Sequence, residues 1–148
     1  MRRMRGWLLS VVGGCLVAGS ALVGHCRLQQ ERAWEAVIMT EAAGESYEGQ
    51  VAVAEVLRNR GWTPRGFAGI RRPDLAHFLA QQPPTVRARA QQALRMARAG
   101  SNLVGGATAF ENVETFGLPR WAGTMEATAK IGRHTFFREK PIERHQEV

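Results

Sequence analysis

The chain has 148 residues, of which 45% are hydrophobic, and a formal net charge of +7. This length supports one domain around a single core and excludes two sizeable domains. Because the two cysteines, Cys15 and Cys26, both lie near the N-terminus, a disulfide framework or a thiolate metal site within the domain body is excluded.

The basic charge suits any polyanion, so nucleic acid and the anionic bacterial envelope are both candidate partners. No run of basic residues interleaved with aromatic residues indicates a platform for stacking bases, so we expect no nucleic acid partner. The histidines lie far apart and lack a paired ligand spacing such as His-x-x-x-His; they are His25, His77, His134 and His145. We therefore expect no metal and no other cofactor.

Residues 1–26 have the pattern of an export or anchoring segment. Residues 1–5 are basic, and the apolar stretch 7–23 is at the short limit for crossing a bilayer. Small residues around Ala21 also fit a signal peptide that is cleaved there. Cleavage and retention as a weak membrane anchor stay open as alternatives. Both predict that the domain leaves the cytoplasm for the periplasm or the cell envelope.

Two helices are predicted next, over residues 29–43 and 47–60. Gly44 is the expected end of the first, Ser46 the expected N-cap of the second, and Gly61 stops the second helix. Apolar residues cover most of the circumference of the second helix, so we expect it to be the central helix of the core.

A carboxylate occupies the apolar face of the first of these helices. Trp34, Val37 and Ile38 follow the i, i+3, i+4 spacing of a buried face, and the next position on that stripe is Glu41. Glu41 should therefore be partly desolvated, and loss of water disfavours the charged form of a carboxylate, which is the profile of a general acid. The alternative is that Glu41 ends the stripe and points into water, because Gly44 follows three residues later.

The remaining chain is expected to continue with a loop, a helix and a β-structure. Residues 62–84 are rich in glycine and proline and predict a loop with one helical turn near 74–80. Residues 85–99 predict an amphipathic helix. Residues 141–148 are expected to form a charged, frayed tail.

Two blocks of sequence closely resemble the spore cortex-lytic enzyme (SleB) type of cell wall hydrolases. Residues 40–60 carry the first block, TEAAGESYEGQVAVAEVLRNR, and residues 105–112 carry the second, GGATAFEN. Trp121 and residues 128–137, TAKIGRHTFF, resemble the C-terminal motif of that family. The resemblance extends over residues 33–138 and is weak in the middle.

The resemblance implies an α+β, mainly helical fold for residues 27–140. We expect a lysozyme-like domain with a small β-hairpin walling the cleft, preceded by an N-terminal apolar helix. Members of this family cut the glycan strands of peptidoglycan. Three aromatic residues of the loop fit either a glycan groove or local packing beneath the loop; they are Trp62, Phe67 and Phe78.

In this family the glutamate of the first block is the catalytic acid, which corresponds to Glu41. The resemblance carries substrate-lining positions over to Thr108, Asn112 and Trp121. His134 matches the last motif, although a packing histidine in the core is an open alternative.

Cleavage of a glycosidic bond by hydrolysis needs a second carboxylate, at about 5–5.5 Å in retaining and about 6.5–9.5 Å in inverting enzymes. Glu45 is the nearest candidate in sequence, yet Gly44 interrupts the helix between it and Glu41. A lytic transglycosylase avoids this requirement because the muramyl 6-hydroxyl is the nucleophile. We therefore expect a monomeric muramidase of the lytic transglycosylase kind. The alternative is a non-catalytic, envelope-associated protein that binds peptidoglycan.

Overall fold

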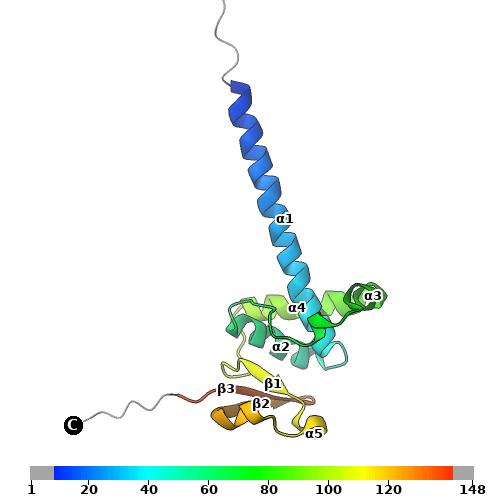
Figure 1. Cartoon of the computed structure of the whole chain (residues 1–148), viewed down its shortest axis with the longest axis vertical. Helices are drawn as coiled ribbons and strands as arrows, with labels where there is room; N and C mark the ends of the chain where they lie inside the picture. Colours follow the sequence, from blue (N-terminus) through cyan, green and yellow to red (C-terminus); the bar gives the residue numbers. More distant parts are fainter. Residues whose placement is uncertain (1–8, 142–148) are drawn as a thin grey trace, which may run out of the picture. The chain divides into compact units, whose positions relative to one another are not determined.

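The computed structural model describes residues 9–141, with side chains from residue 25 onward. Two compact units divide the chain, residues 1–33 and residues 34–148. Helix α1, Leu9–Ala42, begins in the first unit and ends in the second, close to the end that Gly44 predicts (Figure 1). No helix among the described residues is long and apolar enough to cross a membrane. The basic start of the predicted leader and nearly all of the predicted tail lie outside the described residues.

Helix α2, Tyr47–Asn59, is the centre of the second unit. Its N-terminus is capped as predicted, because the Ser46 side chain accepts a hydrogen bond from the Gly49 amide at 3.2 Å. Every residue from 49 to 57 is buried, so the helix is covered on all sides. This burial confirms the prediction of a central core helix.

Two further segments complete the helical part. Helix α4, Pro84–Arg98, packs against α2 and buries Ala90, Ala93, Leu94 and Ala97. The connection between α2 and α4 contains the short helices η1, Gly69–Arg71, and α3, Leu75–Gln81. These helices agree with the predicted amphipathic helix and with the predicted helical turn in the loop.

The loop aromatics pack locally. Phe67 is buried in the core, and its ring lies 6.2 Å from that of Phe110. Trp62 contacts Trp34, whose indole N–H donates to the Trp62 carbonyl at 2.8 Å. The Arg72 guanidinium stacks over the Phe78 ring, 4.1 Å from the centroid of the ring. These contacts favour the packing alternative over a glycan groove.

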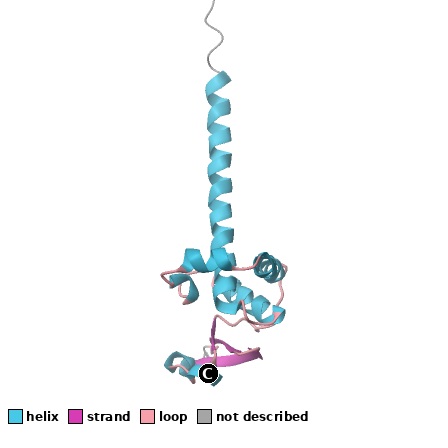
Figure 2. Ribbon diagram, turned by 90° about the vertical axis from the view of Figure 1, so that its right-hand side faces the viewer, coloured by secondary structure: helices cyan, strands magenta, loops and turns pink. Residues whose placement is uncertain are grey.

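A small antiparallel sheet forms the other layer of this unit. It contains β1, Ala109–Glu111, β2, Met125–Ile131, and β3, His134–Glu139, in the order β1-β3-β2. The expected hairpin is thus present as β2 and β3, and β1 adds a third strand that pairs Phe110 with Phe136. Helix α5, Val113–Phe116, and η2, Arg120–Thr124, connect β1 to β2. Figure 2 shows this sheet as a layer apart from the helices.

The register of β3 decides which side chains face the helices. Phe136 is fully buried in the same core cluster as the apolar side chains of α2. Because successive side chains of a strand point to opposite faces, Phe137 faces away from that core. His134, two residues before Phe136, shares the face that looks toward the helices. At the beginning of β3, the His134 side chain therefore lies on the sheet face that is turned toward α1 and α2.

Candidate active site

Glu41 is the penultimate residue of α1 and is partly buried. Its Oε1 accepts a hydrogen bond from the backbone N–H of Gly69, at 2.7 Å. Among residues 25–141, its Oε2 has no hydrogen-bond or ion-pair partner. The partial burial agrees with the helix-face prediction for Glu41, and one oxygen of the carboxylate is held while the other is available.

The approach of the loop to Glu41 depends on Gly69. A Cβ atom at Gly69 would lie 2.4 Å from Thr40 Cβ and 3.1 Å from Glu41 Oε1. The Thr40 side chain is itself held, because its hydroxyl donates to the Ala36 carbonyl at 2.8 Å. Only a residue without a side chain lets the backbone come this close to the carboxylate. Gly69 lies in the stretch where the family resemblance is weak, and no motif in the sequence marks it.

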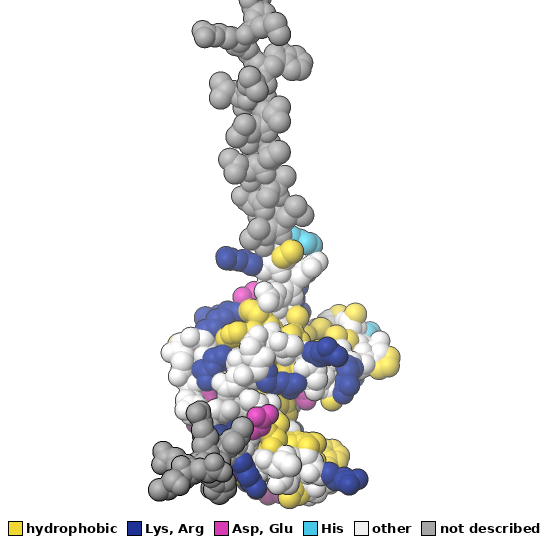
Figure 3. Space-filling view, turned by 60° about the vertical axis from the view of Figure 1, so that its left-hand side comes forward, with side chains coloured by type: hydrophobic (Ala, Val, Ile, Leu, Met, Phe, Trp, Pro, Cys, Tyr) yellow, Lys and Arg dark blue, Asp and Glu magenta, His cyan; other side chains and the backbone are white. Residues whose placement is uncertain are grey.

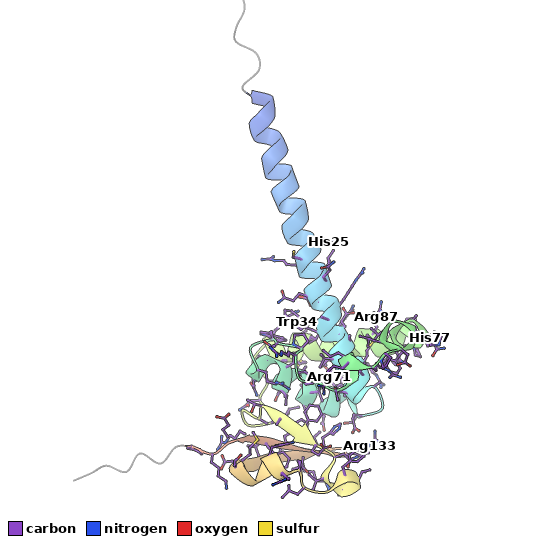
Figure 4. All side chains as sticks on the ribbon, in the orientation of Figure 1. His25, Trp34, Arg71, His77, Arg87 and Arg133 are labelled. Carbon is purple, nitrogen blue, oxygen red and sulfur yellow. The ribbon has the colours of Figure 1, made fainter. Side chains whose placement is uncertain are left out.

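Glu45 is engaged by Arg133. Its Oε1 accepts from Arg133 Nε at 2.8 Å, and its Oε2 lies 3.4 Å from the Arg133 backbone nitrogen. Burial of Glu45 raises its pKa, but the hydrogen bonds and the positive charge of Arg133 outweigh burial and hold the pKa below its ordinary value. Glu45 is therefore an ionised, fully occupied carboxylate. Figure 4 shows Arg133 at the turn between β2 and β3.

His134 lies at the start of β3 and is partly buried. Its ring packs edge-on against Phe110 at 4.9 Å, and within the described part of the chain its buried Nδ1 makes no hydrogen bond. Burial lowers the pKa of His134, against the opposing effect of the carboxylates of Glu45, Glu41 and Glu111. The neutral imidazole is thus favoured. Glu45 contacts the backbone of Arg133, so it links the end of α1, where Glu41 lies, to the start of β3, where His134 lies.

The structure does not bring all of the expected positions to this neighbourhood. Trp121 packs against Phe137, at 5.4 Å and nearly perpendicular, on the sheet face that looks away from the helical core. The Asn112 side chain caps α5 by accepting from the Thr115 amide at 3.1 Å. Thr108 directly precedes β1, and its amide donates to the Phe137 carbonyl. It therefore lies at one end of β1, and Glu111 lies at the other end. Substrate contacts at these three positions stay predictions.

The charges around the site do not form a single basic or metal-binding centre. On the face shown in Figure 3, Lys and Arg side chains are scattered among polar and apolar ones. Within the described residues, no group of three or more His, Cys, Asp or Glu side chains is arranged to hold a metal ion. The titratable side chains Glu41, Glu45 and His134 are carboxylates and an imidazole, which are groups that can transfer protons.

The chain is similar in sequence and fold to known cell wall hydrolases. The model of the cell wall hydrolase family matches residues 44–137. The catalytic domain of Bacillus cereus SleB is 28% identical, with a TM-score of 0.52, and the match covers 74% of this chain and 91% of that one. The catalytic domain of the germination-specific lytic transglycosylase SleB from Bacillus anthracis is 27% identical, with a TM-score of 0.53 and coverage of 74% and 93%.

No curated protein matches the chain significantly. Glu41 itself lies just before the matched segment, so its role depends on the geometry above. The matched segment contains α2, α4 and all of the sheet except the last two residues of β3, and the two related catalytic domains are covered almost completely. On this evidence the chain belongs to the cell wall hydrolase family.

Proposed function

We propose that this protein cleaves the glycan strands of peptidoglycan and that Glu41 acts as its general acid and base. The family assignment and the likeness to a lytic transglycosylase support the substrate and the reaction. The observation that carries the role of Glu41 is its partly buried carboxylate, with one oxygen held by the Gly69 amide. This contact fixes the direction of the second oxygen, which would face the glycosidic bond.

In the proposed reaction, protonated Glu41 donates its proton to the glycosidic oxygen as the bond from that oxygen to the muramyl C1 breaks. The sugar develops oxocarbenium character, and the muramyl 6-hydroxyl attacks C1. The proton of that hydroxyl passes to the Glu41 carboxylate, which returns to its starting state. The products are a shortened strand and a 1,6-anhydro-muramyl end, and no water is consumed.

The state of Glu45 supports transglycosylation over hydrolysis. A hydrolase needs a second carboxylate that contacts water or the sugar. Glu45 is the nearest in sequence, but both of its oxygens face Arg133. It is therefore poorly suited to act as a base or as a nucleophile. One free acid together with an internal hydroxyl nucleophile satisfies the chemistry.

This function requires the domain to act outside the cytoplasm, in the periplasm or the cell envelope, where peptidoglycan lies. Residues 1–26 would supply the export signal or a membrane anchor. His134 would contact the glycan from the sheet side, because it is only partly buried and begins β3 on the face that looks toward the helices. We propose that the enzyme acts as a monomer.

The variant Glu41→Gln tests the assignment. It keeps the size of the side chain but cannot donate a carboxyl proton, so purified sacculi should no longer be cleared, with the circular dichroism spectrum unchanged. Glu48→Gln is the matched control, because Glu48 is an exposed glutamate in the first turn of α2. Mass spectrometry of the wild-type products should show 1,6-anhydro ends.

Three results would contradict parts of this proposal. Ordinary reducing ends among the products would show that the enzyme hydrolyses the glycan and is not a transglycosylase. Clearing by Glu41→Gln at the wild-type rate would reject Glu41 as the acid. Binding of sacculi by the wild-type protein without any clearing would indicate a non-catalytic peptidoglycan-binding protein.

A further inference from the structure

The carboxylate of Glu45 occupies a site shaped for it. Its side chain is only 5% exposed, although that of its partner Arg133 is 67% exposed. A Cβ at Gly132 would lie 2.2 Å from Glu45 Oε2, and a Cβ at Gly49 would lie 2.8 Å from Glu45 Cβ. Gly132 also has a φ of 57°, which favours glycine. Two glycines thus leave room for this one side chain.

The Glu45–Arg133 pair joins two segments that are distant in the sequence. Glu45 follows directly on the turn that ends α1, and its amide donates to the Ala42 carbonyl at 3.0 Å. Arg133 belongs to the turn between β2 and β3. The pair therefore attaches the tip of the β2–β3 hairpin to the end of the helix that carries Glu41.

The residue after Arg133 gives this attachment a consequence for the site. His134 begins β3 on the face that looks toward the helices, and its charge state responds to both Glu45 and Glu41. A shift of the hairpin tip would move His134 and the sheet wall relative to the acid. Both carboxylate oxygens of Glu45 are engaged by Arg133, so Glu45 has no free oxygen for the substrate.

We propose that Glu45 and Arg133 are a positioning pair that holds the β2–β3 hairpin, and with it His134, at the correct distance from Glu41 for cleavage of the glycan. This inference rests on the proposed function for its catalytic part. The pair acts through the hairpin and not on the reacting atoms. Its loss should therefore lower the rate of cleavage in the bound complex, kcat, more than it weakens binding of the substrate.

Two variants break the pair without removing a large buried group. Arg133→Gln changes an exposed side chain, and Glu45→Gln keeps the shape of the buried one. Arg138→Gln is the matched control, because Arg138 pairs with Glu126 across the same two strands but away from the turn.

The first measurement is amide hydrogen exchange, which does not depend on activity. In both variants, amides of residues 131–135 should exchange about tenfold faster or more, while those of α2 keep their protection. Arg138→Gln should leave the hairpin tip unchanged. Unchanged exchange at the tip in Arg133→Gln and Glu45→Gln would overturn the inference, whatever happens to activity.

The second measurement is the steady-state kinetics of cleavage with soluble peptidoglycan fragments of defined length. Each variant should lower kcat about 10- to 100-fold and change KM by less than about threefold, and the double variant should be no worse than the single ones. Wild-type kcat in both variants would overturn the positioning role. A wild-type protein that cleaves no fragment, yet shows the exchange response, would instead refute the proposed function and the catalytic part of this inference with it.

Discussion

Glu41 is held by a residue 28 positions further along the chain. The Gly69 amide donates to Oε1, so the carboxylate is restrained by backbone and not by a flexible side chain. A backbone donor fixes the direction of the second oxygen without adding a charge beside it. At the scale of single residues, the site therefore depends on a glycine as much as on the acid.

Gly69→Ala tests this dependence. The new methyl group would meet Thr40 and Glu41 and displace the loop, so the hydrogen bond to Oε1 should lengthen or break. Cleavage of sacculi should fall by about tenfold or more, because small displacements of a catalytic group are costly. Gly123→Ala is the control, since a Cβ there meets no atom within 4 Å. Equal rates for the two variants would show that the loop does not orient the acid.

Among the elements, α2 organises the unit by holding its neighbours through polar side chains at its C-terminal end. Arg58 Nη1 donates to the carbonyls of Ala97 and Ser101, both at 2.7 Å, where α4 ends. Asn59 Nδ2 donates to the Ala107 carbonyl at 2.8 Å, just before β1. Arg58 thus adds a second donor to the Ala97 carbonyl, which also accepts from the Gly100 amide at 3.2 Å, and it satisfies the Ser101 carbonyl just after the helix. These bonds join the end of α4 and the segment before β1 to the end of α2.

Arg58→Ala should therefore destabilise the domain. It removes two charge-assisted hydrogen bonds and takes from the Ser101 carbonyl its Arg58 donor. The expected loss in the free energy of unfolding is about 2–3 kcal/mol, measured by urea denaturation. Arg95→Ala is the control, because Arg95 is exposed on α4 itself. A change within about 0.5 kcal/mol for Arg58→Ala would mean that these bonds contribute no net stability.

For the whole molecule, the described core lies entirely at Trp34 or later, in the second compact unit. The same unit contains the segment that matches the cell wall hydrolase family. Its polar groups include several that are buried without a hydrogen bond in the described structure, among them His134 Nδ1. Because the pKa of His134 is lowered in the folded state, the stability of the unit should depend on pH.

The pKa of His134 determines the direction of this pH dependence. Burial lowers its pKa below the ordinary value of 6.5 in the folded state, so the unfolded chain binds the proton more readily. Its contribution to stability is then complete above about pH 6.5 and is lost as the pH falls below that value toward the folded-state pKa. The free energy of unfolding should fall more steeply from about pH 7 to about pH 5 in the wild type than in His134→Asn.

Urea denaturation at each pH measures this difference, and parallel curves would contradict it.

Glu45 contributes to stability in a separate, more acidic pH range. Its pKa is lowered from an ordinary value of 4.5, so its contribution is present above that value and is lost only in more acidic solution.

Local patterns in the chain were enough to predict several elements of this fold. Apolar spacing predicted α2 and α4, Ser46 marked a cap, and Gly44 marked the end of α1. The motif blocks also identified the SleB-type family, which the comparisons confirm. These features are predictable because helix periodicity, caps and motifs depend on residues that are neighbours in the chain.

The surroundings of Glu41, in contrast, follow from contacts between distant segments. The Gly69 amide, the Glu45–Arg133 pair across 88 positions, and the packing of Trp121 on the far face of the sheet appear in no local pattern. The helix spacing predicted a partly buried carboxylate but not its partners, and it offered Glu45 as a possible second carboxylate. Contacts between distant segments depend on how helices and strands pack, and that packing is set by the whole core and not by the residues adjacent to the site.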